Sequence, residues 1–464
     1  MRMTKRTVLL AISLAALSVT AADADFKAGF ARVDITPPLG IPMPGYFQKR
    51  LATHVVEPLA AECLAVSYAD TTGFVFSVDN LHLSETVIAR ANAGILARTG
   101  VPAARQFIHS THTHTGGDTR VRKSHTSEEA RLVEFYAELV AARLVEAAVT
   151  AASDLAPSTL AIGKTECRGI SFIRRFRMKD GSVKTNPGFT DPNVVGPLGE
   201  PDESLQLIRF RRAGAPDLAL VNFGTHPDTV GGTGISADWP AYVRSTFENG
   251  VGGGVKCLCL NGAQGDVNHH DRHATPGRAN MPRRLIHLYM GRTIAGAAMH
   301  VWDACEDVPA GPISGAVAQM TAPANVPTAD ERKWIALFDA GKKSEIPLGP
   351  MEIMTLTSPT SRARTLMNGP DHFELPVSSL AIGMSVAFAG FPGEPFVKIG
   401  RDVKAASPFR MTCVACLVNG DNGYFPSTEA FSQGGYEALS SKFARPTGDL
   451  LTAFQVDQLK RLHD

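Results

Sequence analysis

Histidines gather in one short stretch, FIHSTHTHTGGD at residues 107–118, which places three of them within six positions. His112 and His114 are two residues apart, and residues i and i+2 of an extended chain face the same side. Both imidazoles could therefore meet one metal ion or one substrate. His109 falls on the opposite face if the strand continues, so we expect it to serve the strand. The alternative is a hydrogen-bonded polar loop that holds no metal.

Three further segments show the same pattern, an apolar run that ends in a loop of polar residues. Loops at strand ends, held by a rigid sheet, are where sites are usually built. Two histidines and a glutamate from separate strand ends would form a three-ligand zinc site with an open position for water. Each loop also has a plain structural interpretation: a histidine bonded to backbone, an aspartate that caps a helix, or a surface turn. The polar residues concerned are His226 in NFGTHPDTV, Asp266, Asn268, His269 and His270 in NGAQGDVNHH, and Glu394 in FPGEPF.

The elements that must position these loops indicate a mixed α/β architecture. Apolar and polar residues alternate or repeat as strands and helices do, and the order strand, strand, helix, strand, helix near the N-terminus favours this class. We expect one continuous domain over residues 25–464. The stretch 180–204, rich in Pro, Gly, Asp and Asn, is either an ordered surface loop or part of a site. Strands are expected near 28–34, 61–68, 73–81, 105–110, 205–211, 217–224, 310–322, 378–391 and 411–418, helices at 84–99, 127–153 and 283–303, and a helical then extended segment at 325–348.

Composition excludes several classes of function. The chain has 464 residues and a formal net charge of +1, so no strong field draws it to nucleic acid.

Residues 1–24 carry basic residues, then an apolar run, then Ala-Asp-Ala, which predicts a signal peptide and a secreted or periplasmic protein; an uncleaved anchor is the alternative. No later segment is long enough to span a membrane. Seven cysteines leave at least one unpaired, and we interpret Cys413 and Cys416 as structural and expect one disulfide somewhere in the chain.

Taken together, six motifs resemble those of the neutral/alkaline (non-lysosomal) ceramidase family. They are AGFARVDITPP, THTHTGG, NFGTHPDTV, NGAQGDVN, FPGEPF and NGDNGYFPSTEAF, they occur in the family's order, and they cover most of residues 27–440. The resemblance implies mixed β-sheets flanked by helices, with a site at strand-end loops and a Zn²⁺ ion held by His112, His226 and Glu394. The family's fourth ligand is a tyrosine, for which Tyr424 is available, while Asp421 could occupy the same slot and bind zinc itself. His114 would face the reacting group, and Arg174 or Arg175 resembles the family's substrate-contacting arginine.

Two departures from the family bear on the reaction. Asn268 stands where the family's ceramidases carry a nucleophilic serine, and an amide cannot supply an alkoxide. We also expect this chain to lack the family's C-terminal immunoglobulin-like domain. The first hypothesis is therefore a secreted zinc-dependent hydrolase that cleaves an amide bond of a small-molecule or lipid-like substrate by metal-activated water. His114, His269 or His270 would act as general base or oxyanion partner, and the turn at 262–266 would shape the oxyanion pocket.

Two other hypotheses stay open. The same zinc site could act on a carbohydrate or another polar substrate, by hydrolysis or elimination. The chain could also be a zinc-binding protein without catalytic activity.

Overall fold

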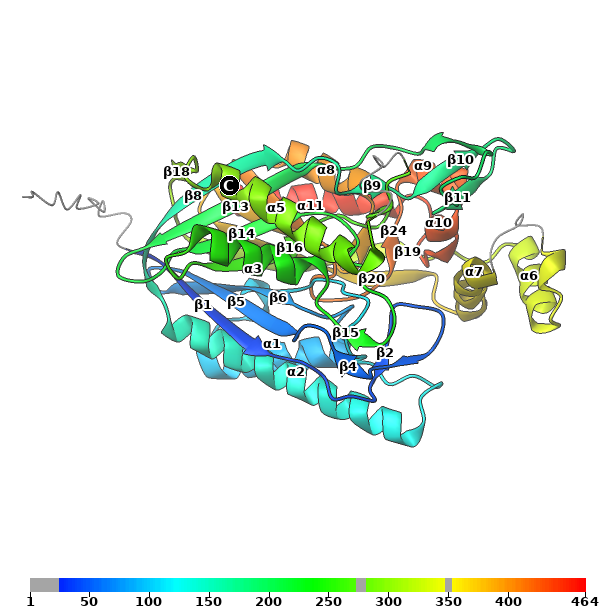
Figure 1. The fold of residues 1–464 in the computed structure, drawn as a ribbon, viewed down its shortest axis with the longest axis horizontal. Helices are drawn as coiled ribbons and strands as arrows, with labels where there is room; N and C mark the ends of the chain where they lie inside the picture. The colour runs from blue at the N-terminus through cyan, green and yellow to red at the C-terminus, as the bar shows by residue number, and fades with distance from the viewer. Residues whose placement is uncertain (1–24, 273–280, 347–352) are drawn as a thin grey trace, which may run out of the picture.

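The computed structural model describes residues 25–272, 281–346 and 353–464. The signal peptide expected at 1–24 lies outside these ranges. Two β-sheets pack face to face, and helices cover the outer face of each, so the order of layers is helices, large sheet, small sheet, helices (Figure 1). The mixed α/β class expected from the sequence is confirmed.

The large sheet has nine strands, in the order β16-β14-β13-β8-β1-β5-β6-β7, with β18 also paired to β8. Most neighbours are antiparallel, but β6 and β7 run parallel, and so do β14 and β16. Its strands are β1 (Phe26–Asp34), β5 (Ala60–Tyr68), β6 (Thr71–Val78), β7 (Gln106–Ser110), β8 (Ala156–Glu166), β13 (Ser204–Arg212), β14 (Leu218–Phe223), β16 (Lys256–Asn261) and β18 (Glu306–Val308).

The small sheet has the order β19-β20-β21-β23, and its last pair is parallel. Its strands are β19 (Ile313–Pro323), β20 (His372–Ile382), β21 (Val386–Gly390) and β23 (Met411–Ala415). Phe107, Phe210, Leu380 and Phe388 meet in the apolar layer between the two sheets. Burial of such side chains on both faces explains why these strands read as continuous apolar runs.

Helices α1 (Glu85–Thr99) and α2 (Ser127–Ser153) cover one half of the large sheet, and α3 (Trp239–Val251) and α5 (Ile286–Trp302) cover the other half. Helices α8 (Val397–Ala406) and α11 (Thr447–His463) cover the small sheet. The limits of α1 follow from its caps, because Ser84 accepts a hydrogen bond at its start and Gly100 ends it in the left-handed conformation. Helix α2 begins with a capping box formed by Thr126 and Glu129.

The remaining elements lie outside the two large layers of strands and their covering helices, and most of them are short. They are β2 (Pro42–Met43), β3 (Arg50–Leu51), β4 (His54–Val55), β9 (Phe172–Ile173), β10 (Arg175–Met178), β11 (Val183–Thr185), β12 (Val194–Pro197), β15 (Gly234–Ile235), β17 (Val267–Asn268), β22 (Glu394–Pro395), β24 (Tyr424–Phe425), α6 (Ala329–Asp339), α7 (Ile353–Leu366), α9 (Thr428–Gln433), α10 (Tyr436–Ser440) and three 3₁₀ helices (Ala103–Arg105, Arg283–Leu285, Lys343–Glu345). Helices α6 and α7 stand together at one end of the molecule (Figure 1).

Several details differ from the sequence-based expectations. The strand expected at 378–391 is two antiparallel strands, because Gly383 turns the chain at a φ of +54°. The extended part expected within 325–348 is wrong where it can be described, since Lys343–Glu345 forms a 3₁₀ helix. No cysteine forms a disulfide, and all seven are buried thiols in the described ranges. In those same ranges, no helix combines the length and apolar character needed to cross a bilayer.

Three pairs of parallel strands end at the same place. The last residues of β7, β14, β16, β21 and β23 lead into the loops and motifs singled out above, and β6 ends beside β7. His109 joins the two sheets there, since its Nδ1 lies 2.6 Å from the Cys416 carbonyl and its Nε2 accepts a hydrogen bond from the Asn261 amide at 3.0 Å. His109 therefore serves the strand, as expected from its position.

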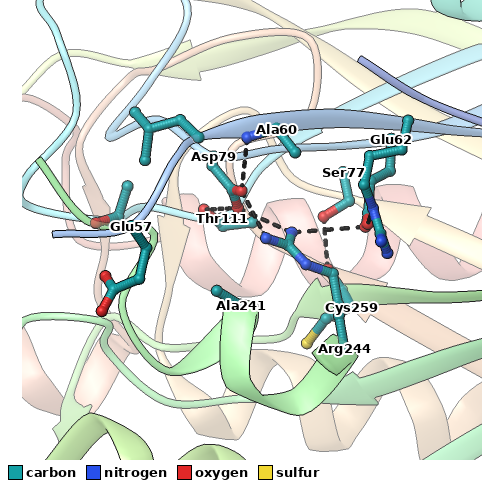
Figure 2. A network of polar contacts seen from close by, with 12 residues as sticks. Glu57, Ala60, Glu62, Ser77, Asp79, Thr111, Ala241, Arg244 and Cys259 are labelled. Atoms are coloured by element: carbon teal, nitrogen blue, oxygen red, sulfur yellow. Dashed lines mark hydrogen bonds and ion pairs between the residues drawn. The ribbon is translucent and has the colours of Figure 1, made fainter. Parts of the chain in front are cut away.

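A buried network of ion pairs stabilises the chain at the end of β6, where the loops of the site begin (Figure 2). Arg244 of α3 donates two hydrogen bonds to Asp79, at 2.9 and 2.6 Å, and its guanidinium also lies 3.5 Å from Glu62. Both carboxylates are fully buried. Asp79 directly follows β6, and its carboxylate accepts a hydrogen bond from the Ala60 amide at 3.0 Å. The network thus fixes the chain where it leaves β6 for the loops of the site.

Candidate metal centre and cavity

His112 and His114 leave β7 through a sharp turn. The Thr111 amide still bonds the Val78 carbonyl, but His112 adopts a left-handed φ of +74° and its amide donates to the Asn80 carbonyl at 2.9 Å. Thr113 and Thr115 both donate their hydroxyls to the Ser236 carbonyl, at 2.6 and 2.9 Å. The alternation in THTHT thus sets threonines on one side and the two histidines on the other.

Other strand ends bring His226 and Glu394 to the same place. His226 follows β14, and Glu394 lies in the turn after β21. The Glu394 Oε2 atom is 3.4 Å from His112 Nε2 and 3.8 Å from His226 Nε2. One ring nitrogen from each of His112, His114 and His226 falls within 4.8 Å of the others. We call these three residues the histidine cluster, and all three are buried.

Two members of the cluster are oriented through Nδ1. His112 Nδ1 lies 2.8 Å from the Leu81 carbonyl, and His226 Nδ1 lies 3.4 Å from the Gln264 carbonyl. A ring nitrogen bound to a carbonyl carries the proton, so the opposite nitrogen keeps its lone pair. The Nε2 atom of His112, which faces Glu394, is therefore free to act as a ligand, whereas His226 Nδ1 also lies 3.5 Å from the Arg174 guanidinium, which can only donate. The ring nitrogens of His114 are both buried and make no hydrogen bond among the described residues.

Burial and neighbouring cations keep most of the cluster neutral. The pKa of His226 lies well below its ordinary value because the ring is buried and Arg174 and His112 disfavour its charge. The pKa of His114 also lies well below its ordinary value, because the ring is buried and because His112 and Arg50 disfavour its charge. His112 differs, because the adjacent Glu394 carboxylate outweighs burial and raises its pKa.

The cluster fits a bound cation such as Zn²⁺. The Glu394 Oε2 atom, like both nitrogens of His114, is buried without a hydrogen-bond partner in the described chain. Buried polar atoms normally have partners, so a buried carboxylate oxygen beside two unpaired ring nitrogens fits a cation bound among them. Imidazole nitrogens with one carboxylate oxygen are the donors that zinc takes in catalytic sites. His112, His226 and Glu394 approach one another as ligands of one ion would, and His114 lies beside them.

Arg174 and Tyr424 form the wall next to the cluster. The Arg174 guanidinium lies 3.5 Å from His226 Nδ1 and 5.4 Å from the centre of the Tyr424 ring. It is held by Glu437, at 2.7 Å, and by the Gly265 carbonyl, at 2.7 Å. Tyr424 pairs in register with Glu394 between β24 and β22. Arg174, not its neighbour Arg175, therefore faces the site.

Arg175 has a structural role instead. Its guanidinium donates to the carbonyls of Ala430 and Gly434, at 3.4 and 2.6 Å, and to the Gln433 side chain. These bonds hold the segment that carries Glu437, so Arg175 supports Arg174 indirectly.

The turn at 262–266 packs behind the cluster. A Cβ on Gly265 would lie 2.6 Å from the Glu394 carbonyl oxygen, so glycine is required for this close approach. Asp266 accepts a hydrogen bond from the Val397 amide at the start of α8, 2.8 Å away, which matches the helix-capping alternative. The turn thus supports Glu394 from the side away from the cavity.

Asn268 and His269 lie further along the same segment. The Asn268 amide donates to the Asn186 side chain at 2.7 Å and its oxygen accepts from the His270 amide at 2.9 Å. Neither Asn268 nor His269 is among the described residues that line the cavity, whereas Asn186 is. Asn268 can therefore reach a cavity ligand through Asn186.

Asp421 stands apart from the histidine cluster. Its carboxylate lies 3.7 Å from His82 Nδ1 and 3.9 Å from Arg120, and it accepts a hydrogen bond from the Gly423 amide. Burial opposes its charge, but His82, Arg120 and His112 lower its pKa overall. Of the two residues considered for the fourth ligand, Tyr424 borders the cavity and Asp421 is engaged by His82.

A cavity of about 730 Å³ opens beside the cluster, and His114, His226, Arg174 and Tyr424 line it. The stretch 180–204 was expected to be an ordered surface loop or part of a site, and residues 183–188 and 191 of it line the cavity. Sequence reasoning missed Tyr46, Asp228 and the buried Glu437. The only signal for Asp228 was its place in the His-Pro-Asp turn, and nothing in the sequence linked Tyr46 to residues about 180 positions away.

Two solved structures share this fold. Neutral ceramidase from Pseudomonas aeruginosa matches with a TM-score of 0.70 at 18% sequence identity, over 95% of this chain and 74% of that chain. A ceramidase complexed with C2 matches with a TM-score of 0.67 at 17% identity, over 95% of this chain and 75% of that chain. No family model and no curated protein matches the sequence. At these identities the likeness shows the fold, so the chemistry must be argued from this chain's own residues.

Proposed function

We propose that this chain is a zinc-dependent hydrolase that cleaves an N-acyl amide bond in the cavity beside the histidine cluster. The observation that carries this proposal is the convergence of His112, His226 and Glu394 from three strand ends, next to His114 and a cavity. The fold shared with two ceramidases, which are amide hydrolases by name, supports the choice of bond. His112, His226 and Glu394 would hold the ion.

The chemistry divides between the ion and the protein. A zinc ion at the cluster supplies a Lewis acid that polarises a carbonyl and makes water more acidic. His114 lies in the cluster and lines the cavity, so we assign it as the general base that takes a proton from water and later returns it to the leaving amine. Arg174 is fixed by Glu437 and the Gly265 carbonyl, which pre-organises its remaining N–H groups to bind an oxygen of the substrate.

This proposal needs no side-chain nucleophile. Asn268 has no hydroxyl from which an alkoxide could form, and its side chain is engaged with Asn186 and the His270 backbone. The nucleophile is therefore water, and Asn268 acts only by holding the Asn186 side chain. Asn268→Ala should leave hydrolysis within about tenfold of the parent chain, a far smaller loss than removal of a nucleophile causes.

The test is hydrolysis by the full chain of a set of N-acyl amides, compared with His112→Ala. The variant should lose activity and bound zinc together while the fold persists, because the side chain of His112 offers its Nε2 to the site. His300→Ala is the matched control, since His300 lies exposed on α5, and it should behave as the parent does. If zinc is bound but no amide is cleaved, the non-catalytic zinc-binding hypothesis holds instead.

The cavity lining favours a second candidate, the same site acting on a carbohydrate or another polar substrate. A lipid-binding pocket is lined mainly by apolar and aromatic side chains, whereas the described lining here mixes Phe47, Val183 and the rings of three tyrosines with many polar and charged groups. Both basic and acidic side chains line the cavity, namely Arg50, Arg174, Lys184, Asp191 and Asp228. Short polar amides and polyhydroxylated compounds should therefore be better substrates than long-chain N-acyl lipids. A substrate series that varies only the acyl length decides this, and a preference for the longest chain contradicts it.

A further inference from the structure

Asn186 lies at the cavity directly after β11. It lines the cavity together with Arg174, and its backbone amide donates to the Arg174 carbonyl at 2.7 Å. Its φ of +50° is left-handed, a conformation that asparagine adopts more readily than most residues. Thr185, just before it, pairs in register with Arg175 and donates its hydroxyl to the buried Glu437 at 2.8 Å. The backbone that carries Asn186 is therefore held in place.

The side chain of Asn186 is held by the buried Asn268. Asn268 Oδ1 accepts a hydrogen bond from the His270 backbone amide at 2.9 Å. A backbone N–H can only donate, so this bond decides which end of the Asn268 amide is the oxygen. The Asn268 Nδ2 atom then donates to Asn186 at 2.7 Å. Because the receiving atom has to be an acceptor, it is the Oδ1 atom of Asn186.

The Asn186 Nδ2 atom is the open end of this chain of hydrogen bonds. Asn186 is exposed, and its Nδ2 donates to no partner among the residues that the structure describes. Two neighbours on the same wall are already engaged, since the Thr185 hydroxyl donates to Glu437 and the Lys184 ammonium lies 3.6 Å from Asp191. Asn186 therefore offers a fixed N–H donor to a molecule in the cavity.

The kind of donor indicates the kind of ligand. The N–H₂ group of an amide donates and does not accept, so it recognises an oxygen with a free lone pair. A carbonyl oxygen is its direct complement, because a hydroxyl would bring a proton that also needs an acceptor. Donors fixed before binding lose little entropy when the ligand arrives, which makes such a group suited to discriminate between substrates.

We propose that Asn186 is a specificity-determining residue whose Nδ2 binds a carbonyl oxygen of the substrate outside the scissile amide, and that Asn268 is the positioning residue that orients it. The substrates would be short amides with a second carbonyl close to the bond that is cleaved, as in N-acyl amino acids and peptides. The inference rests on the proposed function for the cleaved bond, but the binding of the second carbonyl can be tested without cleavage.

The test uses two pairs of amides, and the members of each pair differ by one oxygen. In the first pair the amine part is acetonyl or isobutyl, and in the second pair the acyl part is acetoacetyl or 3-methylbutanoyl. Each pair replaces a carbonyl by a CH–CH₃ group of similar shape. The members also differ in intrinsic reactivity, so the readout is the ratio of kcat/KM within a pair, compared between the zinc-loaded parent chain and its variants.

Asn186→Gly removes the donor and keeps a residue that accepts the left-handed φ. It should lower kcat/KM for the carbonyl member of at least one pair by about 3–10-fold, the usual contribution of one neutral hydrogen bond, and leave the other member unchanged. Asn249→Ala is the matched control, because Asn249 is an exposed asparagine on α3 outside the described cavity lining. It should keep the ratios of the parent.

Asn268→Asp separates orientation from shape. The new carboxylate, when ionised, can still accept from the His270 amide but cannot donate to Asn186. The Asn186 amide should then turn its N–H₂ group to position 268 and its oxygen to the cavity. This variant should lose the preference for the carbonyl member as Asn186→Gly does, although Asn186 itself is unchanged.

Three results overturn the inference. Ratios that stay unchanged in Asn186→Gly show that Asn186 does not bind the substrate, and an equal loss for both members of a pair shows a structural role. Ratios like those of the parent in Asn268→Asp show that Asn268 does not orient Asn186. If the zinc-loaded parent cleaves none of these amides, the proposed function fails, and calorimetric dissociation constants of the same uncleaved amides still decide whether Asn186 binds the carbonyl.

Discussion

The ion pair of Arg244 with Asp79 offers a prediction whose size follows from burial (Figure 2). Arg244→Met keeps most of the side-chain length but removes the guanidinium, which leaves the fully buried Asp79 carboxylate without a cation. Glu62 keeps Arg32, whose Nε lies 2.5 Å away. Breaking one partner out of a buried pair costs about 3–5 kcal/mol of unfolding free energy, and we expect a loss of this size from Asp79 alone.

Equilibrium unfolding by urea measures this loss against an exposed pair. Arg143→Met removes a surface contact with Glu146 at 2.5 Å and should cost less than about 1 kcal/mol. Replacing both charges, as Arg244→Met with Asp79→Leu, should recover stability relative to the single variant, since no unpaired carboxylate remains. Equal losses from the Arg244 and Arg143 variants, or a double variant less stable than Arg244→Met, would refute the reasoning.

Three further predictions concern the surroundings of the site. Burial raises the pKa of the Asp266 carboxyl from 3.8 to about 6, so between these pH values the folded chain binds more protons than the unfolded chain. The unfolding free energy should therefore fall by roughly 3 kcal/mol as the pH rises through this interval. In Asp266→Asn, the unfolding free energy measured by urea titration should depend less on pH over the same interval. Gly265→Ala should weaken zinc binding, measured by competition with a chelator, because its Cβ would press on the Glu394 backbone, whereas Gly296→Ala, with open space around it, should not. His109→Leu should cost about 1–3 kcal/mol in thermal or urea unfolding but leave the zinc content unchanged, since both its ring nitrogens bond backbone; loss of zinc would contradict its structural place.

The sequence predicted those parts of the fold that depend on local signals. The helices expected at 84–99 and 127–153 are α1 (Glu85–Thr99) and α2 (Ser127–Ser153). The spacing of His112 and His114 predicted their shared side, and His109 was correctly set apart. Helices α3, α8 and α11 went unrecognised; α8 does bury one apolar face, but it has only ten residues, too few for the pattern to stand out in the sequence.

The parts that could not be predicted depend on contacts between distant segments. Whether Arg174 or Arg175 faces the site depends on Glu437, about 260 residues away. Asp421 and Tyr424 could not be ranked as ligands, because His82 and the register of Tyr424 with Glu394 decide their places. Such choices follow from the packing of the two sheets, which no short motif encodes.

Anomalous diffraction at the zinc edge, on crystals of the full chain, tests the central claim most directly. The account predicts one strong peak bonded to His112 Nε2, His226 Nε2 and the Glu394 carboxylate, at about 2.0–2.2 Å from each. Zinc bound elsewhere, or no peak among these three residues after zinc is supplied, would contradict it.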